Sequence, residues 1–190
     1  MQVAVISDIH SNFAALDRVL MEIEKQKIKT IYCLGDMIGY GNEPEEVIQA
    51  LRLRNAICIA GNHEMMLLKG EDRKGMNLSK TKTQLSSESL QFIAHLPRER
   101  ILEEFDVILS HALPYTDDAY LYANSNFSVL DDIPHHTIFM GHSHYPMLMS
   151  YYDKKIINPG SVGQPRDGQE KSSYLICDFN FDRCTFHRVG

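Results

Sequence analysis

The sequence predicts an α/β fold, and three observations support that class. Continuous apolar runs alternate with helical patterns over the first third of the chain, polar residues follow the ends of several runs, and the last quarter is rich in short strands. Alternation of strands and helices is typical of layered folds with parallel strands. We therefore expect a four-layer α/β/β/α sandwich with mixed sheets, and a single domain over residues 1–190; one mixed sheet is the alternative.

The first sixty residues are expected to form a β-α-β-α-β unit. Residues 3–6 are continuously apolar, which suits a strand covered on both faces. Asn12 is a suitable N-cap for the next helix. That helix carries one apolar stripe at helical spacing: Leu16, Val19, Leu20 and Ile23. A strand over 30–34, a helix over 43–53 and a strand over 55–60 complete the unit.

The remaining elements are shorter. Residues 69–82 are polar and charged and predict a solvated loop, with a mobile flap beside the site as the lesser alternative. Helical patterns cover 87–96 and 125–131, and strands are expected at 105–109 and 137–140. The last quarter predicts antiparallel strands over 147–152, 154–157, 173–179 and 183–189. Tight turns are expected at 153–154 and around Asn180 and Asp182.

Composition narrows the class of protein. The chain has 44% hydrophobic and 23% charged residues, as ordinary globular proteins do. The formal net charge is −6 with histidine neutral, so no broad nucleic-acid footprint is visible. No apolar run is long enough to span a bilayer and no leader pattern is present, so we expect a cytoplasmic protein, for which a homo-oligomer is allowed. The four cysteines are expected to be reduced: Cys33, Cys58, Cys177 and Cys184.

Potential metal-binding residues follow five of the apolar runs. They are Asp8-Ile9-His10, Gly35-Asp36, Gly61-Asn62-His63-Glu64, His111 and Gly141-His142-Ser143-His144. Strand ends in α/β folds line one crevice, so these groups should gather there. A pair of divalent ions in such a crevice can clamp a phosphoryl group. Such a pair of ions needs a shared oxygen ligand, which a carboxylate can provide. Asp36 can supply it because a carboxylate has two oxygens.

This ordered set resembles the calcineurin-like metallophosphoesterases. The resemblance continues through residues 158–166, which look like the small single-domain prokaryotic phosphodiesterase branch. It implies one metal held by Asp8, His10, Asp36 and His144, and a second held by Asp36, Asn62, His111 and His142. It also implies that His63 is the general acid or orients the phosphate, while a water or hydroxide bridging the ions attacks phosphorus in line. The nitrogen and oxygen ligands favour two divalent ions, with manganese expected and iron, zinc, cobalt or nickel also suitable.

Substrate contacts are less specified. The Ser/Thr protein phosphatase branch carries an Asp-Arg pair soon after its Gly-Asp, and residues 35–41 lack that arginine. Arg166 could contact phosphate instead, although a surface arginine is an equal alternative, and Asn12 could position substrate or only cap its helix. Tyr115, Tyr120 and Tyr122 could line a pocket for a base or aryl group, or cover the core. His95, His135, His136 and His187 are expected to lie outside the site.

The expected function is hydrolysis of a small phosphate ester, and we interpret the chain as a phosphodiesterase. A phosphomonoesterase, a protein phosphatase or a nucleotide polyphosphate hydrolase would keep the chemistry and change the substrate. A non-catalytic scaffold is the alternative from another class. The retromer coat subunit resembles this family yet lacks the catalytic histidine, whereas His63 is present here.

Overall fold

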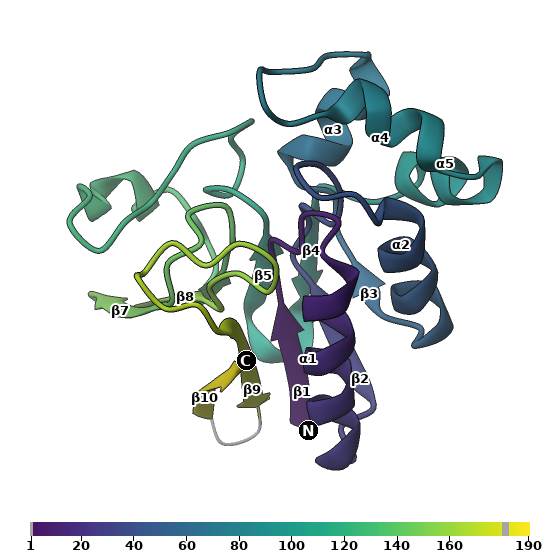
Figure 1. Ribbon diagram of the computed structural model, residues 1–190. Coiled ribbons are helices and arrows are strands. Elements are labelled where there is room, and N and C mark those ends of the chain that lie inside the picture. The colour runs from purple at the N-terminus through teal and green to yellow at the C-terminus, as the bar shows by residue number, and fades with distance from the viewer. Residues whose placement is uncertain (1, 180–182) are drawn as a thin grey trace.

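Two five-stranded mixed sheets form the centre of the protein, in a computed structural model that describes residues 2–179 and 183–190 (Figure 1). The first sheet has the order β10-β9-β1-β2-β3. Its strands are β1 Gln2–Ile6, β2 Thr30–Cys33, β3 Ile57–Cys58, β9 Ser172–Asp178 and β10 Arg183–Val189. Strands β1, β2 and β3 are parallel, while β9 runs antiparallel to β1 and to β10.

The second sheet has the order β4-β5-β6-β8-β7. Its strands are β4 Glu99–Leu102, β5 Val107–Ser110, β6 Thr137–Phe139, β7 Met147–Tyr151 and β8 Lys154–Asn158. Strands β5, β6 and β8 are parallel, and the edge strands β4 and β7 are antiparallel to their neighbours. Both sheets are therefore mixed, as the sequence predicts.

Alternation along the strands divides the core into layers. Val3 and Val5 of β1 pack between the two sheets against residues such as Phe139 and Leu175. Ala4 and Ile6 point to the other face, where they pack under the helices. The helices are α1 Phe13–Lys25, α2 Pro44–Leu53, α3 Asn62–Lys69, α4 Leu78–Gln84 and α5 Ser87–Ala94.

The outer face of the second sheet is covered differently. Ile138 and Ile156 pack there against Leu121 and Leu130. Leu121 comes from the connection between β5 and β6, and Leu130 from its one 3-10 turn, η2 Phe127–Leu130. The four-layer architecture is confirmed, with an irregular segment as its outermost layer on this side.

The structure corrects several local expectations. The polar segment 69–82 is not wholly a loop, because α4 begins at Leu78. Strand β4 was not predicted, because its four residues contain no long apolar run. Two of them are exposed and two are half-buried. A disulfide joins Cys177 and Cys184, so the expectation of four reduced thiols is wrong for this pair. The two residues lie directly opposite each other in the β9–β10 register.

Two further expectations concern the turn before the last strand and the absence of a membrane span. The turn predicted around Asn180 and Asp182 lies outside the described residues. Among the described helices, none combines the length and apolar character needed to cross a membrane.

Candidate metal centre

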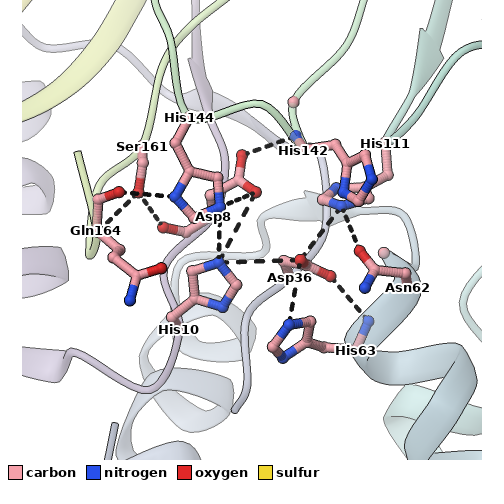
Figure 2. Close-up of polar contacts among 12 residues, drawn as sticks. Asp8, His10, Asp36, Asn62, His63, His111, His142, His144, Ser161 and Gln164 are labelled. Carbon is pink, nitrogen blue, oxygen red and sulfur yellow. Dashed lines mark hydrogen bonds and ion pairs between the residues drawn. The ribbon is translucent and has the colours of Figure 1, made fainter. Parts of the chain in front are cut away.

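The metal-binding residues predicted from the motifs gather at one edge of both sheets (Figure 2). Five segments bring them there, directly after β1, β2, β3, β5 and β6. The seven predicted ligands and the predicted catalytic residue His63 are all buried, with no more than 9% of their surface exposed: Asp8, His10, Asp36, Asn62, His63, His111, His142 and His144. The parallel strands of both sheets therefore deliver their polar ends to a single crevice.

The chain turns sharply at these strand ends. The backbone has positive φ, between 50° and 65°, at five of the site residues: Asp8, His10, Asp36, His142 and His144. Residues other than glycine adopt this left-handed region at a cost. Gly61 allows a further close approach, because a Cβ atom there would lie 2.2 Å from Asp36 Oδ1.

Asp36 lies between two sets of ligand-type side chains. We name Asp8, His10 and His144 the first half, and Asn62, His111 and His142 the second half. Nitrogen and oxygen atoms of the first half lie within 4.8 Å of one another, and so do those of Asp36, His111 and His142. Asp36 Oδ2 is 3.9 Å from His10 Nε2 and 3.3 Å from His111 Nε2. One carboxylate oxygen thus faces both halves.

The residues present fit divalent cations. Asp8 Oδ1 is fully buried and makes no well-formed hydrogen bond among the described residues, and the ligand-type atom His144 Nε2 lies 3.2 Å from it. A buried carboxylate oxygen normally accepts a hydrogen bond, so an oxygen and a nitrogen that face each other in this way fit a shared cation. Imidazole nitrogens and carboxylate and amide oxygens, without thiolate, form a donor set that suits Mn, Fe, Zn, Co or Ni.

Electrostatics within the crevice favour negative carboxylates. Burial alone would raise the pKa of Asp36, but the neighbouring His111 and His63 hold that pKa well below its usual range. Burial likewise opposes the charged form of His111, yet the adjacent Asp36 raises the pKa of His111 to about 10. Burial lowers the pKa of His10 to about 3 and that of His142 to about 4. These two imidazoles are therefore neutral and ready to act as ligands at pH 7.

Backbone carbonyls fix three of the imidazoles. Nδ1 of His10 donates to Ile38 O at 3.3 Å, Nδ1 of His111 to Leu34 O at 2.8 Å, and Nδ1 of His144 to Gln164 O at 2.7 Å. A carbonyl can only accept, so Nδ1 carries a proton in each of these rings, and Nε2 is the nitrogen left to face a cation.

His142 is held in another way. Its Nε2 lies 2.9 Å from Asp118 Oδ1, and the Tyr120 ring stacks on it with centroids 3.7 Å apart. Asp118 in turn pairs with Arg73, at 3.1 Å. Side chains of the β5–β6 connection thus pack against this one ring, although the approach of Asp118 lacks hydrogen-bond geometry.

Comparison with known proteins assigns the family. A family model described as the calcineurin-like phosphoesterase superfamily domain matches residues 1–182. The chain belongs to this superfamily. An uncharacterised protein of Methanocaldococcus jannaschii, MJ0912, is 39% identical over 201 residues, covering 93% of this chain and 82% of the relative.

Two further relatives agree with the assignment. Phosphodiesterase YfcE of Escherichia coli K12 is 24% identical, covering 93% of this chain and 87% of the enzyme. A metallophosphoesterase crystal structure from Sphaerobacter thermophilus superposes with a TM-score of 0.85 at 30% identity, covering all of this chain and 88% of that one. The resemblance inferred from the motifs is therefore confirmed.

Glu64 is a structural residue of this phosphoesterase that the sequence did not assign, although it ends the Gly-Asn-His-Glu motif. It is fully buried and accepts hydrogen bonds from four backbone N–H groups, those of Asp36, Met37, Ile38 and Gly61, at 2.8–3.2 Å. Burial, with Asp36 nearby, raises the pKa of Glu64 to about 7. Glu64 ties the turn that carries Asp36 to the start of α3.

His63 adjoins Asp36. Its backbone N–H donates to Asp36 Oδ1 at 2.9 Å, and its Nε2 lies 3.8 Å from Asp36 Oδ2. Its ring contacts those of His10 and Tyr40. Burial lowers the pKa of His63.

The two candidate substrate contacts lie at the rim of the phosphoesterase site. Asn12 caps α1 by accepting from Ala15 N, and its amide donates to Gly163 O at 3.0 Å. It also lines an open groove of about 500 Å³ next to His10. Arg166 is exposed and donates to Gln164 Oε1.

The other histidines make contacts elsewhere. His95 Nδ1 faces Gln91 O, His135 pairs with Asp106, His136 is next to Thr137 Oγ1, and the His187 ring stacks on Tyr174.

Proposed function

We propose that this chain is a phosphodiesterase that uses two divalent metal ions. Two sets of residues would hold the ions: Asp8, His10, Asp36 and His144 for the first, and Asp36, Asn62, His111 and His142 for the second. When bound, such ions polarise phosphoryl oxygens and lower the pKa of a water molecule between them. We propose manganese as the ion, with iron, zinc, cobalt and nickel as the comparisons.

The position of Asp36 supports a two-ion centre. Its Oδ1 already accepts the His63 N–H, whereas its Oδ2 faces His10 on one side and His111 on the other. Oδ2 is thus the atom available to both halves. Asn62 Oδ1 lies 3.1 Å from His111 Nε2, which places the amide oxygen beside the second half.

An open groove at one end of the site and exposed aromatic rings at the other support a diester over a monoester, and this observation carries the proposal. A groove of about 500 Å³ opens beside His10. Beside His142, the exposed rings of Tyr120 and Tyr122 bound the other end. A phosphodiester carries two substituents, and the groove and the exposed rings offer a contact surface to each.

His63 is proposed to act on the leaving group. It lies against Asp36 on the side away from His142 (Figure 2). A donor there can protonate the leaving oxygen, or stabilise the charge that develops on it. Because it is within the crevice but outside both proposed ligand sets, its removal should leave the ions in place.

The test combines metal content with turnover. Protein loaded with manganese should hydrolyse bis(p-nitrophenyl) phosphate faster than p-nitrophenyl phosphate, and the metal-free protein should hydrolyse neither. His63→Ala should keep two ions per chain by element analysis and lose about 10²–10⁴-fold in turnover. His95→Ala, on the exposed end of α5, is the matched control.

Three results would count against the proposal. Loaded protein that cleaves neither ester would contradict a phosphoesterase, and a preference for the monoester would contradict a diesterase. Unchanged turnover in His63→Ala would remove that residue from the mechanism.

A further inference from the structure

Three tyrosine rings gather beside the second half of the centre. Tyr120, Tyr122 and Tyr145, which we name the aromatic row, are 46%, 37% and 43% exposed. Leu121, between the first two, is 1% exposed and packs into the core on the outer face of the second sheet. The apolar anchor of this segment is therefore Leu121, and the tyrosines do not serve as core cover. Grouped exposed aromatic rings beside a buried polar crevice are typical of binding surfaces.

The row begins at a proposed metal ligand and extends outwards. Tyr120 stacks on His142 with ring centroids 3.7 Å apart and an interplanar angle of 24°. Tyr122 lies parallel to Tyr120, at 5.7 Å and 2°, and Tyr145 meets Tyr122 edge-on at 6.0 Å. A parallel pair with an edge-on neighbour offers a planar ring both face and edge contacts.

Arg166 completes this surface. Burial raises the pKa of Tyr120, and the neighbouring Arg166 guanidinium acts in the opposite direction on that pKa. A planar guanidinium can itself stack on an aromatic ring and can donate to a phosphate oxygen. Residues 120–122, Tyr145 and Arg166 thus combine ring faces with a cation at one end of the site.

We infer that the aromatic row binds a planar ring on the ester arm that is retained, so that preferred substrates are phosphodiesters whose retained arm carries an aromatic group. This inference rests on the proposed function. The assignment of the arm follows from His63, which is proposed to act on the leaving oxygen and lies on the side of Asp36 away from His142 (Figure 2). The arm that reaches the row is then the one that stays on phosphorus.

The test holds the leaving group constant. Benzyl p-nitrophenyl phosphate and ethyl p-nitrophenyl phosphate both release p-nitrophenolate and differ only in the retained arm. The manganese-loaded protein should show a higher kcat/KM for the benzyl ester. Tyr122→Ala should lower kcat/KM for the benzyl ester by about 5–150-fold, which corresponds to the roughly 1–3 kcal/mol of one stacking contact. It should lower kcat/KM for the ethyl ester by a smaller factor, because the ethyl arm offers no ring to stack.

Two variants act as controls. Tyr122→Phe keeps the ring face and should retain the preference, because stacking does not require the hydroxyl. Tyr152→Ala removes a ring that is 88% exposed in the turn between β7 and β8, and it should change neither rate. Tyr122 is chosen because Tyr120 touches the proposed ligand His142.

The outcomes separate the two proposals. If the loaded protein cleaves neither ester, the proposed function fails. If it cleaves both with equal kcat/KM, the function stands and the aromatic row is overturned. An equal loss on both esters in Tyr122→Ala would show a general structural effect and would also overturn the row.

Discussion

His142 and His144 lie two residues apart in one turn, yet the protein fixes their rings by different means. His144 donates to the backbone carbonyl of Gln164, in a segment that is itself bound to the Asp8 backbone through Ser161 and Gly163. His142 relies on the side chains of Asp118 and Tyr120. A backbone partner survives every substitution, whereas a side-chain partner can be exchanged by one mutation. Mutations in the β5–β6 connection can therefore change the surroundings of His142 in the second half, while His144 in the first half keeps its backbone partner.

The largest expected effect comes from Asp36, the residue that lies between the two halves. Asp36→Asn removes the negative charge between them, so we expect both ions to be lost. Element analysis after desalting should fall from two ions per chain to none. Asp153→Asn, in the exposed turn between β7 and β8, should keep both. An unchanged metal content in Asp36→Asn would contradict the assignment of this carboxylate.

A smaller effect is expected from Glu64, which supports Asp36 from behind. Glutamine replaces one acceptor oxygen by an amide that would face backbone N–H donors, leaving buried donors unsatisfied. Glu64→Gln should therefore lower the free energy of unfolding of the metal-free protein by about 3 kcal/mol. Urea unfolding would measure it, with the exposed Glu71→Gln as the reference. Equal midpoints for the two variants would show that these hydrogen bonds contribute little.

Asp118 tests the difference between the two histidines directly. Asp118→Ala should weaken the binding of one ion by about 10–100-fold, as loss of an outer-shell partner of a metal-binding histidine does. The other ion should keep its affinity in calorimetric titration. Asp117→Ala is the matched control, because Asp117 is exposed, adjacent in sequence and paired only with Arg98 among the ion pairs of the described residues. Equal weakening of both ions would remove the distinction.

The smallest expected effect is the release of a single proton when metal binds. At pH 7.5 the His111 imidazole, with its pKa raised to about 10 by Asp36, carries a proton that metal binding must displace, whereas His10 and His142 are already neutral. Titration in buffers of different ionisation enthalpy should show release of about one proton. The same shift stabilises the metal-free protein fully below pH 6.5, and this contribution is lost as the pH rises through about 10. Release of no proton would contradict the raised pKa.

The sequence could predict the strand ends and the side chains that follow them, because apolar runs and motif spacing are local. It could not predict Asp118, which lies 24 residues before His142 in a segment without a motif and reaches it only through the path of the β5–β6 connection. The Cys177–Cys184 disulfide was missed because it depends on the register of the β9–β10 pair. Glu64 was within a recognised motif, but its contacts with the backbone after β2 required the tertiary structure.

The left-handed backbone conformation at five site residues affects how the stability of this protein responds to mutation. The five residues are Asp8, His10, Asp36, His142 and His144. Each such residue costs about 1 kcal/mol or more relative to a relaxed backbone. Replacement of one of these residues by glycine would release strain while it deletes a proposed metal ligand. An inactive descendant of this protein could therefore tolerate heat better than its parent, so a screen for thermal tolerance alone would select against the centre.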